Sequence, residues 1–166
     1  MKIDDLISRF KKVEKLLEAK PWFKNEKWIV SVHPFPPKSP EGVTLQVFKK
    51  NWFNDERQGI HFESYFDLNP KKQKKTYVTL HALHADEIPG TKISRKEFAK
   101  PLVDQIHDEV ASWEGYEFRT GKYGQQPFTK FLDATDEKFE THLAKELMRL
   151  CERVGPQVDK VLKSLT

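Results

Sequence analysis

Histidines and carboxylates alternate with apolar residues in one β-rich segment near the middle of the chain. Within residues 59 to 68, the odd positions carry His61, Glu63, Tyr65 and Asp67, and the even positions are mostly large and apolar. Successive side chains of a strand point to opposite faces of a sheet, so a strand here would place the four polar side chains together. Imidazole and carboxylate groups on one face can ligate a divalent metal ion or act as a general acid and base.

A second β-rich segment, residues 76 to 84, supplies a neighbour for this face. Its odd positions up to residue 81 are polar, and Val78, Leu80 and Ala82 are apolar. We expect the two segments to pair as antiparallel strands whose facing residue numbers sum to 144. The expected pairs are Glu63 with His81, Tyr65 with Thr79, and Asp67 with Tyr77. This pairing makes His61, Glu63 and His81 the candidate catalytic residues.

Two earlier segments, residues 28 to 33 and 43 to 50, extend the same polar face by their alternation. The candidate ligand-binding residues on the combined face are Ser31, His33, Gln46, Lys50, Tyr65, Asp67 and Tyr77. The candidate metal ligands are His33, His61, Glu63 and His81, and the cofactor they indicate is a divalent metal ion. A carboxylate beside a histidine would also orient the imidazole tautomer. In contrast, His84 would point to the opposite face from His81.

An ordinary water-facing sheet surface explains the same residues without any site. Antiparallel sheets commonly have one face in solvent, and such a face carries His, Glu, Thr, Tyr and Lys. The alternation therefore predicts where the polar face lies and leaves its role open.

Lysines gather where these two strands should be joined, and aromatic residues lie nearby. Lys71, Lys72, Lys74 and Lys75 could contact phosphates, together with Lys49 and Lys50, while Trp52, Phe53 and Tyr65 could stack on bases. Nucleic acid is nevertheless disfavoured as a partner, because arginines that read base edges are absent from this loop and nearby Asp and Glu residues dilute the charge. A solvated loop accounts for the lysines equally well.

Two aromatic doublets, Trp22-Phe23 and Trp52-Phe53, occupy positions that read as loops. Exposed rings there would mark a partner or ligand surface. The favoured interpretation is that the rings are buried at the ends of the sheet core.

Several catalytic motifs are missing from the sequence. Thr120-Gly-Lys-Tyr-Gly124 lacks the Gly-Lys-Ser/Thr ending of a phosphate-binding loop, and no dinucleotide fingerprint, Gly-x-Ser-x-Gly or His-Glu-x-x-His motif occurs. The single cysteine, Cys151, falls in an apolar helical pattern and is expected to be a core residue. His107 and His142 read as surface histidines of helices.

The remaining pattern predicts an α+β fold in which amphipathic helices pack on an antiparallel sheet of four to six strands. Apolar residues at three- and four-residue spacing predict a first helix from Ile3 to Leu17, which Pro21 ends. Further helices are expected from a capping box at Ser94-Arg-Lys-Glu97, from Asp136 onward, and after Gly155-Pro156. With short strands at 116–119 and 127–132, the expected order is α-β-β-β-β-α-β-β-α-α in a single domain spanning residues 1 to 166.

Composition narrows the class of protein. The chain has 166 residues, 37% hydrophobic and 33% charged, with a net charge of +4, which is well below that of a strongly basic nucleic-acid-binding protein. Charges interrupt the first twenty residues every few positions, so neither a signal peptide nor a membrane span is expected there. One cysteine suits a reducing compartment, and we expect a soluble protein of the cytoplasm that does not contact the membrane.

Two functions remain open at this point. The favoured hypothesis is a binding or interaction module that uses the polar sheet face, or the aromatic loop edges, to hold a protein or a small-molecule ligand. The alternative is a metal-dependent hydrolase, such as a phosphoesterase or nuclease, with Glu63 and Asp67 as ligands or bases and Lys50 as an electrostatic stabiliser. Whether the protein is an enzyme stays undecided.

Overall fold

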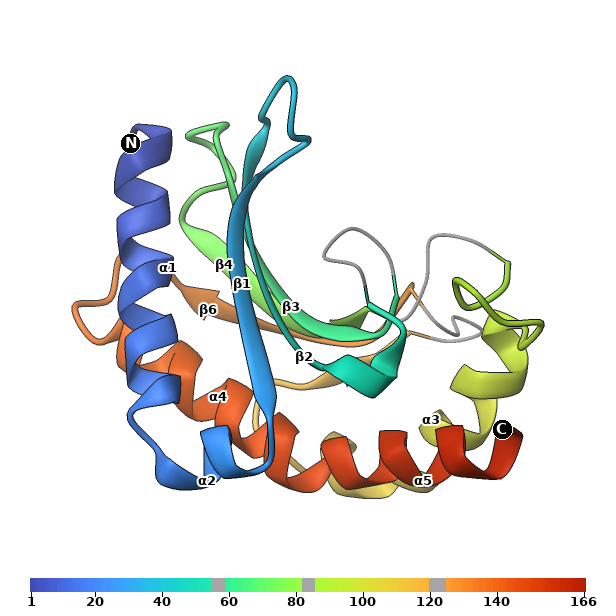
Figure 1. Ribbon diagram of the computed structural model, residues 1–166. Helices are drawn as coiled ribbons and strands as arrows, with labels where there is room; N and C mark the ends of the chain where they lie inside the picture. Colours follow the sequence, from blue (N-terminus) through green and yellow to red (C-terminus); the bar gives the residue numbers. More distant parts are fainter. Residues whose placement is uncertain (55–58, 82–85, 120–124) are drawn as a thin grey trace.

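A curved antiparallel sheet forms the centre of the protein. The computed structural model describes residues 1–54, 59–81, 86–119 and 125–166. Six strands are hydrogen-bonded in the order β1-β2-β3-β4-β6-β5, so the first four form a meander (Figure 1). Their bounds are β1 Trp28–Phe35, β2 Gly42–Lys49, β3 His61–Asp67, β4 Lys75–His81, β5 Glu117–Phe118 and β6 Gln125–Asp133.

Five α-helices accompany the sheet in the described part of the chain. They are α1 Ile3–Glu18, α2 Pro21–Asn25, α3 Arg95–Ala111, α4 Phe139–Arg153 and α5 Gly155–Leu165, and a 3-10 turn, η1, covers Lys50–Trp52. The expected fold class and order of elements are confirmed. One addition is α2, which Pro21 opens instead of simply ending the previous helix, because the fixed φ of proline suits the first turn.

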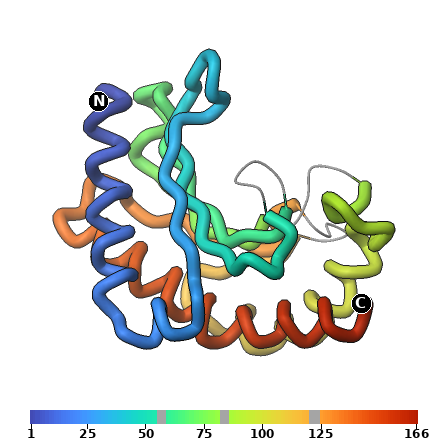
Figure 2. Tube along the Cα trace, in the orientation of Figure 1, coloured from blue at the N-terminus to red at the C-terminus, as the bar shows by residue number. Residues whose placement is uncertain are grey.

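The long helices pack along the outer side of the curved sheet. In Figures 1 and 2, α1 stands beside the first strands while α4 and α5 run below them, which leaves the inner side of the curve facing away from the helices. Apolar residues of β2, β3 and β4 meet those of α1 and α4 in one buried cluster, where Phe10 stacks on Phe66 with ring centroids 4.4 Å apart. The polar face of the sheet is therefore the face that the helices leave uncovered.

The register between β3 and β4 differs from the expected one. His61 faces His81 and Glu63 faces Thr79, so facing residue numbers sum to 142, and the expected sum of 144 is wrong by two. A shift of two residues keeps every side chain on its face, because the strand repeat is also two. The odd-numbered residues of β3 and β4 consequently still share the polar face, but their direct partners change.

Strand β1 continues through Pro34 and Phe35, two residues beyond the expected segment of residues 28 to 33. Pro34 lies opposite Val43, and β1 has only β2 as a neighbour. An edge strand tolerates proline, because the missing N–H is not needed by a second neighbouring strand.

Local signals fix the start of α3. Ser94 Oγ accepts from Glu97 N at 3.1 Å, and Glu97 Oε2 accepts from Ser94 N at 2.7 Å, which confirms the expected capping box.

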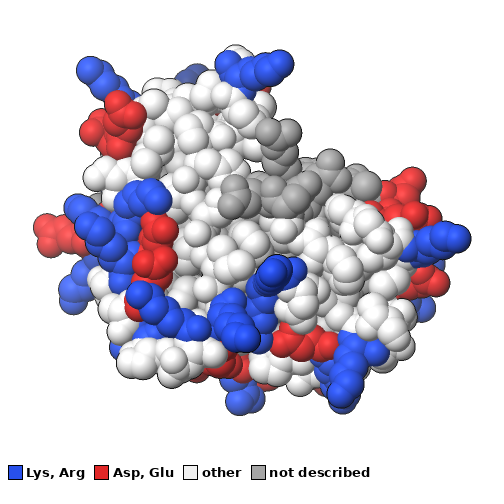
Figure 3. Space-filling view, viewed as in Figure 1, with Lys and Arg blue, Asp and Glu red and all other residues white. Residues whose placement is uncertain are grey.

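Lysine, arginine and acidic side chains are interspersed over the helices in Figure 3, so this side carries no field of a single sign. No helix in the described part of the chain is long and apolar enough to cross a membrane.

Some expected features lie outside the described residues. They are the orientation of Ala82 and His84, and the glycine-containing segment of residues 120 to 124.

Candidate metal centre

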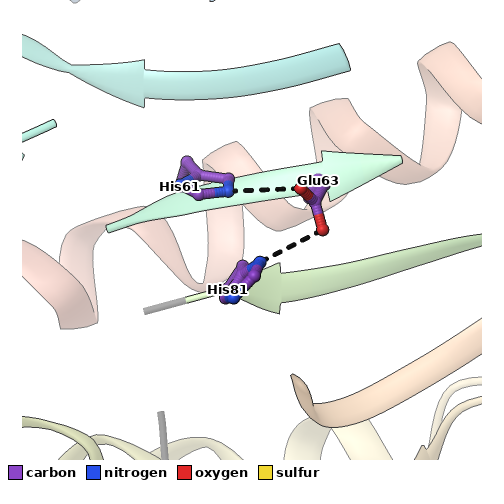
Figure 4. A group of neighbouring side chains, drawn as sticks. All are labelled: His61, Glu63 and His81. Atoms are coloured by element: carbon purple, nitrogen blue, oxygen red, sulfur yellow. Dashed lines mark hydrogen bonds and ion pairs between the residues drawn. The ribbon is translucent and has the colours of Figure 1, made fainter. Parts of the chain in front are cut away.

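His61, Glu63 and His81 converge on the polar face of the sheet. One donor atom from each side chain can be chosen so that all three atoms lie within 4.8 Å of one another. The carboxylate contacts both imidazoles, with His61 Nε2 3.6 Å from Glu63 Oε1 and His81 Nδ1 3.2 Å from Glu63 Oε2 (Figure 4). These are the three candidate catalytic residues of the sequence, now brought into one cluster.

Strand geometry alone explains this convergence. His61 and His81 are direct partners across β3 and β4, and Glu63 follows His61 by two positions on the same face. Directly opposed side chains in an antiparallel pair start about 5 Å apart at Cβ, which matches the 5.1 Å between the two ring centroids. The cluster is therefore held by the hydrogen-bonded ladder of two strands inside the sheet.

The carboxylate of Glu63 is ionised and well satisfied. Thr44 Oγ1 donates to Oε1 at 3.3 Å, Tyr77 OH donates to Oε2 at 3.3 Å, and His81 Nδ1 contacts Oε2. Burial alone would raise the pKa of Glu63, but its contacts with His61 and His81 outweigh burial and hold the pKa well below its usual range. A buried negative charge is thus fixed at the centre of the cluster.

His61 has one ring nitrogen anchored and the other turned towards this charge. Its Nδ1 lies 3.1 Å from Gly59 O and 2.9 Å from Asn54 Nδ2. Two neutral tautomers fit these contacts. If Nδ1–H donates to the Gly59 carbonyl, Nε2 presents a lone pair towards Glu63; if Nδ1 accepts from the Asn54 amide, Nε2–H points at the carboxylate, 3.6 Å away and beyond hydrogen-bond distance. Burial lowers the pKa of His61, although Glu63 opposes this, so the charged imidazolium is disfavoured and the ring is available as a neutral ligand.

In the tautomer with the proton on Nδ1, a cation between these groups satisfies both at once. It accepts the lone pair of His61 and neutralises the carboxylate of Glu63, and a backbone carbonyl on the other ring nitrogen is the usual support of a metal-bound histidine. For metal–donor distances near 2.0–2.1 Å in a tetrahedron, donors lie about 3.3 Å apart. The His61–Glu63 and His81–Glu63 separations of 3.6 and 3.2 Å are close to that value, but they end on different oxygens of Glu63. A set with one donor atom from each residue spans up to 4.8 Å, so the side chains must close in to bind one ion in a tetrahedron.

The cluster opens into a hollow of about 230 Å³ on the sheet face. Its described lining comprises Phe35, Glu41, Thr44, Gln46, His61, Glu63, Tyr65, Tyr77, His81 and Gln126. Gln46 is only 4% exposed, and its Oε1 has no hydrogen-bond partner within the described residues. Burying an unpaired carbonyl costs free energy, so this oxygen is a ready acceptor for a ligand in the hollow.

Two tyrosines form the wall of the hollow beyond Glu63. Burial raises the pKa of Tyr65 to about 12, with Asp67, Glu41 and Glu63 adding to the rise. Burial and the charge of Glu63 raise the pKa of Tyr77 further. Both side chains are therefore neutral phenols at physiological pH. Tyr77 donates its proton to Glu63, whereas Tyr65 can donate a hydrogen bond to a ligand.

The other candidate residues lie at various distances from the cluster along the sheet. Ser31 and His33 are on β1, where Ser31 Oγ lies 3.0 Å from His33 Nδ1, and they are not part of the hollow's lining. Lys50 is exposed in η1, because the strand ends at Lys49 and the alternation ends with it. Asp67 lies at the far end of β3 beside Lys72, 3.8 Å away.

The structure also places residues that the candidate set omitted. Phe35, Glu41 and Gln126 line the hollow although they lie at or beyond strand ends, where alternation carries no information. Thr44 was assigned to the polar face but not singled out, and it proves to bond Glu63 directly. The aromatic doublets contribute to the core: Phe23 and Trp52 are 1% and 0% exposed.

Cys151 is buried, and burial raises its thiol pKa well above the usual value, so it is an inert core residue. His107 and His142 are exposed side chains on α3 and α4.

Comparison of the chain with models of protein families, with curated proteins and with solved structures finds no match. The hollow and its residues are therefore the observations on which a function rests.

Proposed function

We propose that this protein binds a divalent transition-metal ion through His61, Glu63 and His81, and that the hollow beside the ion holds a small ligand. The observation that carries the proposal is the convergence of two imidazoles on one buried carboxylate, with donor atoms within 4.8 Å. Two histidines and a carboxylate form a ligand set of zinc and non-haem iron sites that keep an open position.

The donor set favours some metals over others. Imidazole nitrogen suits Zn²⁺, Co²⁺, Ni²⁺ and Fe²⁺, whereas Mg²⁺ and Ca²⁺ prefer shells built of oxygen. Three protein donors also leave at least one coordination position towards the hollow, where a ligand atom can bind the ion directly.

The lining of the hollow supports a polar ligand with some apolar surface. Gln46 Oε1 offers an acceptor, Tyr65 and Tyr77 offer phenolic groups, and the Phe35 ring closes one side. A pocket with an apolar wall and a few convergent polar groups is typical of small-molecule sites.

Thermal unfolding of metal-free protein, with and without added Zn²⁺, tests the proposal. A ligand that binds only the native state adds about 2.7 kcal/mol of stability at a hundredfold excess over its Kd, which raises the Tm of a domain of this size by several degrees. The Glu63→Gln variant keeps the size of the side chain and removes the charge, so we expect its zinc-dependent shift to be lost.

The matched control is His33→Ala, which removes a histidine from the same sheet face outside the hollow. It should retain the full shift. An equal zinc shift in wild-type protein and Glu63→Gln, or no shift with Zn²⁺, Co²⁺, Ni²⁺ or Fe²⁺ in wild-type protein, contradicts the proposal.

A metal-dependent hydrolase is the second candidate, and Glu41 favours it. Glu41 lines the hollow but is not one of the three clustered ligands, so its carboxylate is available as a general base near a bound ion. We expect wild-type protein to hydrolyse a chromogenic phosphodiester when metal is added. Glu41→Gln and Glu63→Gln should each lose this turnover. If Glu41→Gln turns over normally, Glu41 has no such role; if wild-type protein shows no turnover, the candidate fails while metal binding stands.

A further inference from the structure

Three aromatic side chains form a row across neighbouring strands of the uncovered sheet face. Tyr65 is on β3, Tyr77 on β4 and Phe131 on β6, and Tyr77 is paired directly with Phe131. Phe131 is 61% exposed, which makes it the most exposed large apolar side chain described. A single exposed ring is ordinary on a protein surface, but a ring that lies beside two other aromatic side chains offers a surface for stacking.

Lysines border this row on the side of the β3–β4 connection. Lys71, Lys72, Lys74 and Lys75 line one hollow of about 470 Å³ together with the three rings, and Asp67 is the only acidic residue of its described lining. Asp67 is paired with Lys72 at 3.8 Å. The other three lysines make no ion pair within the described residues, so their charge is available to an anion.

This basic, aromatic hollow adjoins the hollow of the metal centre. Tyr65 and Tyr77 line both hollows, so the two lie next to each other along β3 and β4, and we refer to them together as the groove. Glu63 and Asp67 are four residues apart on β3, which at about 3.3 Å per residue separates the two ends of the groove by roughly 13 Å. An occupant that uses the whole groove must therefore be elongated.

We propose that this groove binds single-stranded nucleic acid, with bases stacked on the aromatic row and phosphates against the lysines. Stacking on exposed aromatic rings, with cations along the backbone, is how sheet faces bind single strands without strong sequence preference. At about 3.4 Å per stacked nucleotide, roughly four nucleotides span 13 Å. The missing arginines argue against readout of base edges, but this mode of binding does not need such readout.

The proposal is separate from metal binding, because neither the rings nor the lysines are metal ligands. Binding is therefore measured with EDTA present, by fluorescence anisotropy of a fluorescein-labelled ten-nucleotide oligothymidylate at 50 mM salt. We expect saturable binding that weakens steeply as salt rises, since each neutralised phosphate of a single strand contributes about −0.7 to the slope of log K against log salt.

Two variants with controls locate the binding surface. Phe131→Ala should weaken binding at least about tenfold, since loss of one stacked base has effects of that order, while Phe131→Trp should preserve it. Lys71→Gln combined with Lys74→Gln should flatten the salt slope by about 1.4. The control, Lys20→Gln with Lys24→Gln, removes the same charge from exposed positions at α2 and should leave the slope unchanged.

Each contrary outcome overturns the proposal in its own way. Absence of binding at 50 mM salt removes it outright. If both lysine double variants flatten the salt slope equally, or if Phe131→Ala binds the oligonucleotide as tightly as wild-type protein, the interaction is only non-specific attraction by net charge. If adenosine monophosphate competes as well as the oligonucleotide at equal nucleotide concentration, the groove binds small phosphorylated ligands instead. If the protein binds a duplex with the same affinity as the single strand, base stacking is excluded.

Discussion

His61 and His81 face each other across β3 and β4, and their ring planes are tilted by 47° at a centroid distance of 5.1 Å. Both side chains are buried, at 2% and 7% exposure. Two imidazoles so close together in a buried place cannot both be positively charged at low cost, because like charges repel strongly where water is excluded. Two imidazoles and one carboxylate are thus gathered where a bound cation would favour neutral rings.

The first prediction concerns the choice of metal. We expect Zn²⁺, Ni²⁺ and Co²⁺ to raise the Tm of metal-free protein, Mn²⁺ to do so less, and Mg²⁺ and Ca²⁺ at the same concentration to have no effect. His61→Ala and His81→Ala should each abolish most of the zinc shift. A stabilising effect of Mg²⁺ that survives both substitutions would place the cation at another site.

The second prediction concerns Gln46, whose buried Oε1 has no partner within the described residues. Replacing a side chain whose buried carbonyl oxygen is unpaired by an apolar one of similar size removes a desolvation cost, so Gln46→Leu should stabilise metal-free protein by about 1 kcal/mol, or roughly 2–4 °C in Tm. Thr44→Val on the same strand is the comparison: it removes the hydrogen bond to Glu63 and should lower the Tm. A lower Tm in Gln46→Leu would show that the amide is satisfied in the free protein.

The faces of the sheet were predictable from the sequence because face assignment depends only on whether a residue number is odd or even. The register was not: it depends on the length and path of the connection through residues 68 to 74, which alternation does not describe. A register error of two residues left the metal candidates on one face but gave Glu63 the wrong partner, since Thr79 and not His81 is opposite it.

Residues at strand ends and contacts between distant segments were beyond the sequence pattern. Lys50 was assigned to the polar face, yet the chain turns into η1 after Lys49 and Lys50 faces solvent. Glu146 was not recognised at all, because its partners Tyr116 and Lys130 come from separate parts of the chain. Periodicity describes one element at a time, whereas these contacts depend on how elements pack together.

The third prediction concerns pH and Glu146 on α4. This buried carboxylate accepts from Tyr116 OH at 2.8 Å, Lys130 Nζ at 2.9 Å and Arg149 at 2.6 Å. Burial would raise its pKa, but the contacts with Arg149, Lys130 and Tyr116 outweigh burial and lower it. Because the folded-state pKa lies below the unfolded value, the stabilisation is present above the unfolded pKa of about 4.3 and is lost as pH falls through the folded pKa.

Glu146→Gln should therefore cost about 2 kcal/mol at pH 7, and the difference from wild-type protein should shrink as pH falls below about 5. Urea unfolding at several pH values measures this difference. Glu114→Gln, at an exposed position, serves as the control and should change little. A difference for Glu146→Gln that stays constant down to pH 3 would mean that the charge of the carboxylate does not matter.

The fourth prediction concerns Asp159, which ties α5 to the end of β2. Its Oδ1 accepts from the indole N–H of Trp52 at 2.8 Å, and its Oδ2 accepts from Lys49 Nζ at 2.9 Å. Trp52 is fully buried, so Asp159→Ala leaves the indole N–H without an acceptor and should destabilise the protein by about 1–3 kcal/mol. In the background of Trp52→Phe, which has no N–H, the same substitution should cost distinctly less, because the group it orphans is already gone. Urea unfolding of the two single variants and the double variant gives this coupling directly, and additive losses would show that the Trp52–Asp159 hydrogen bond contributes nothing to stability.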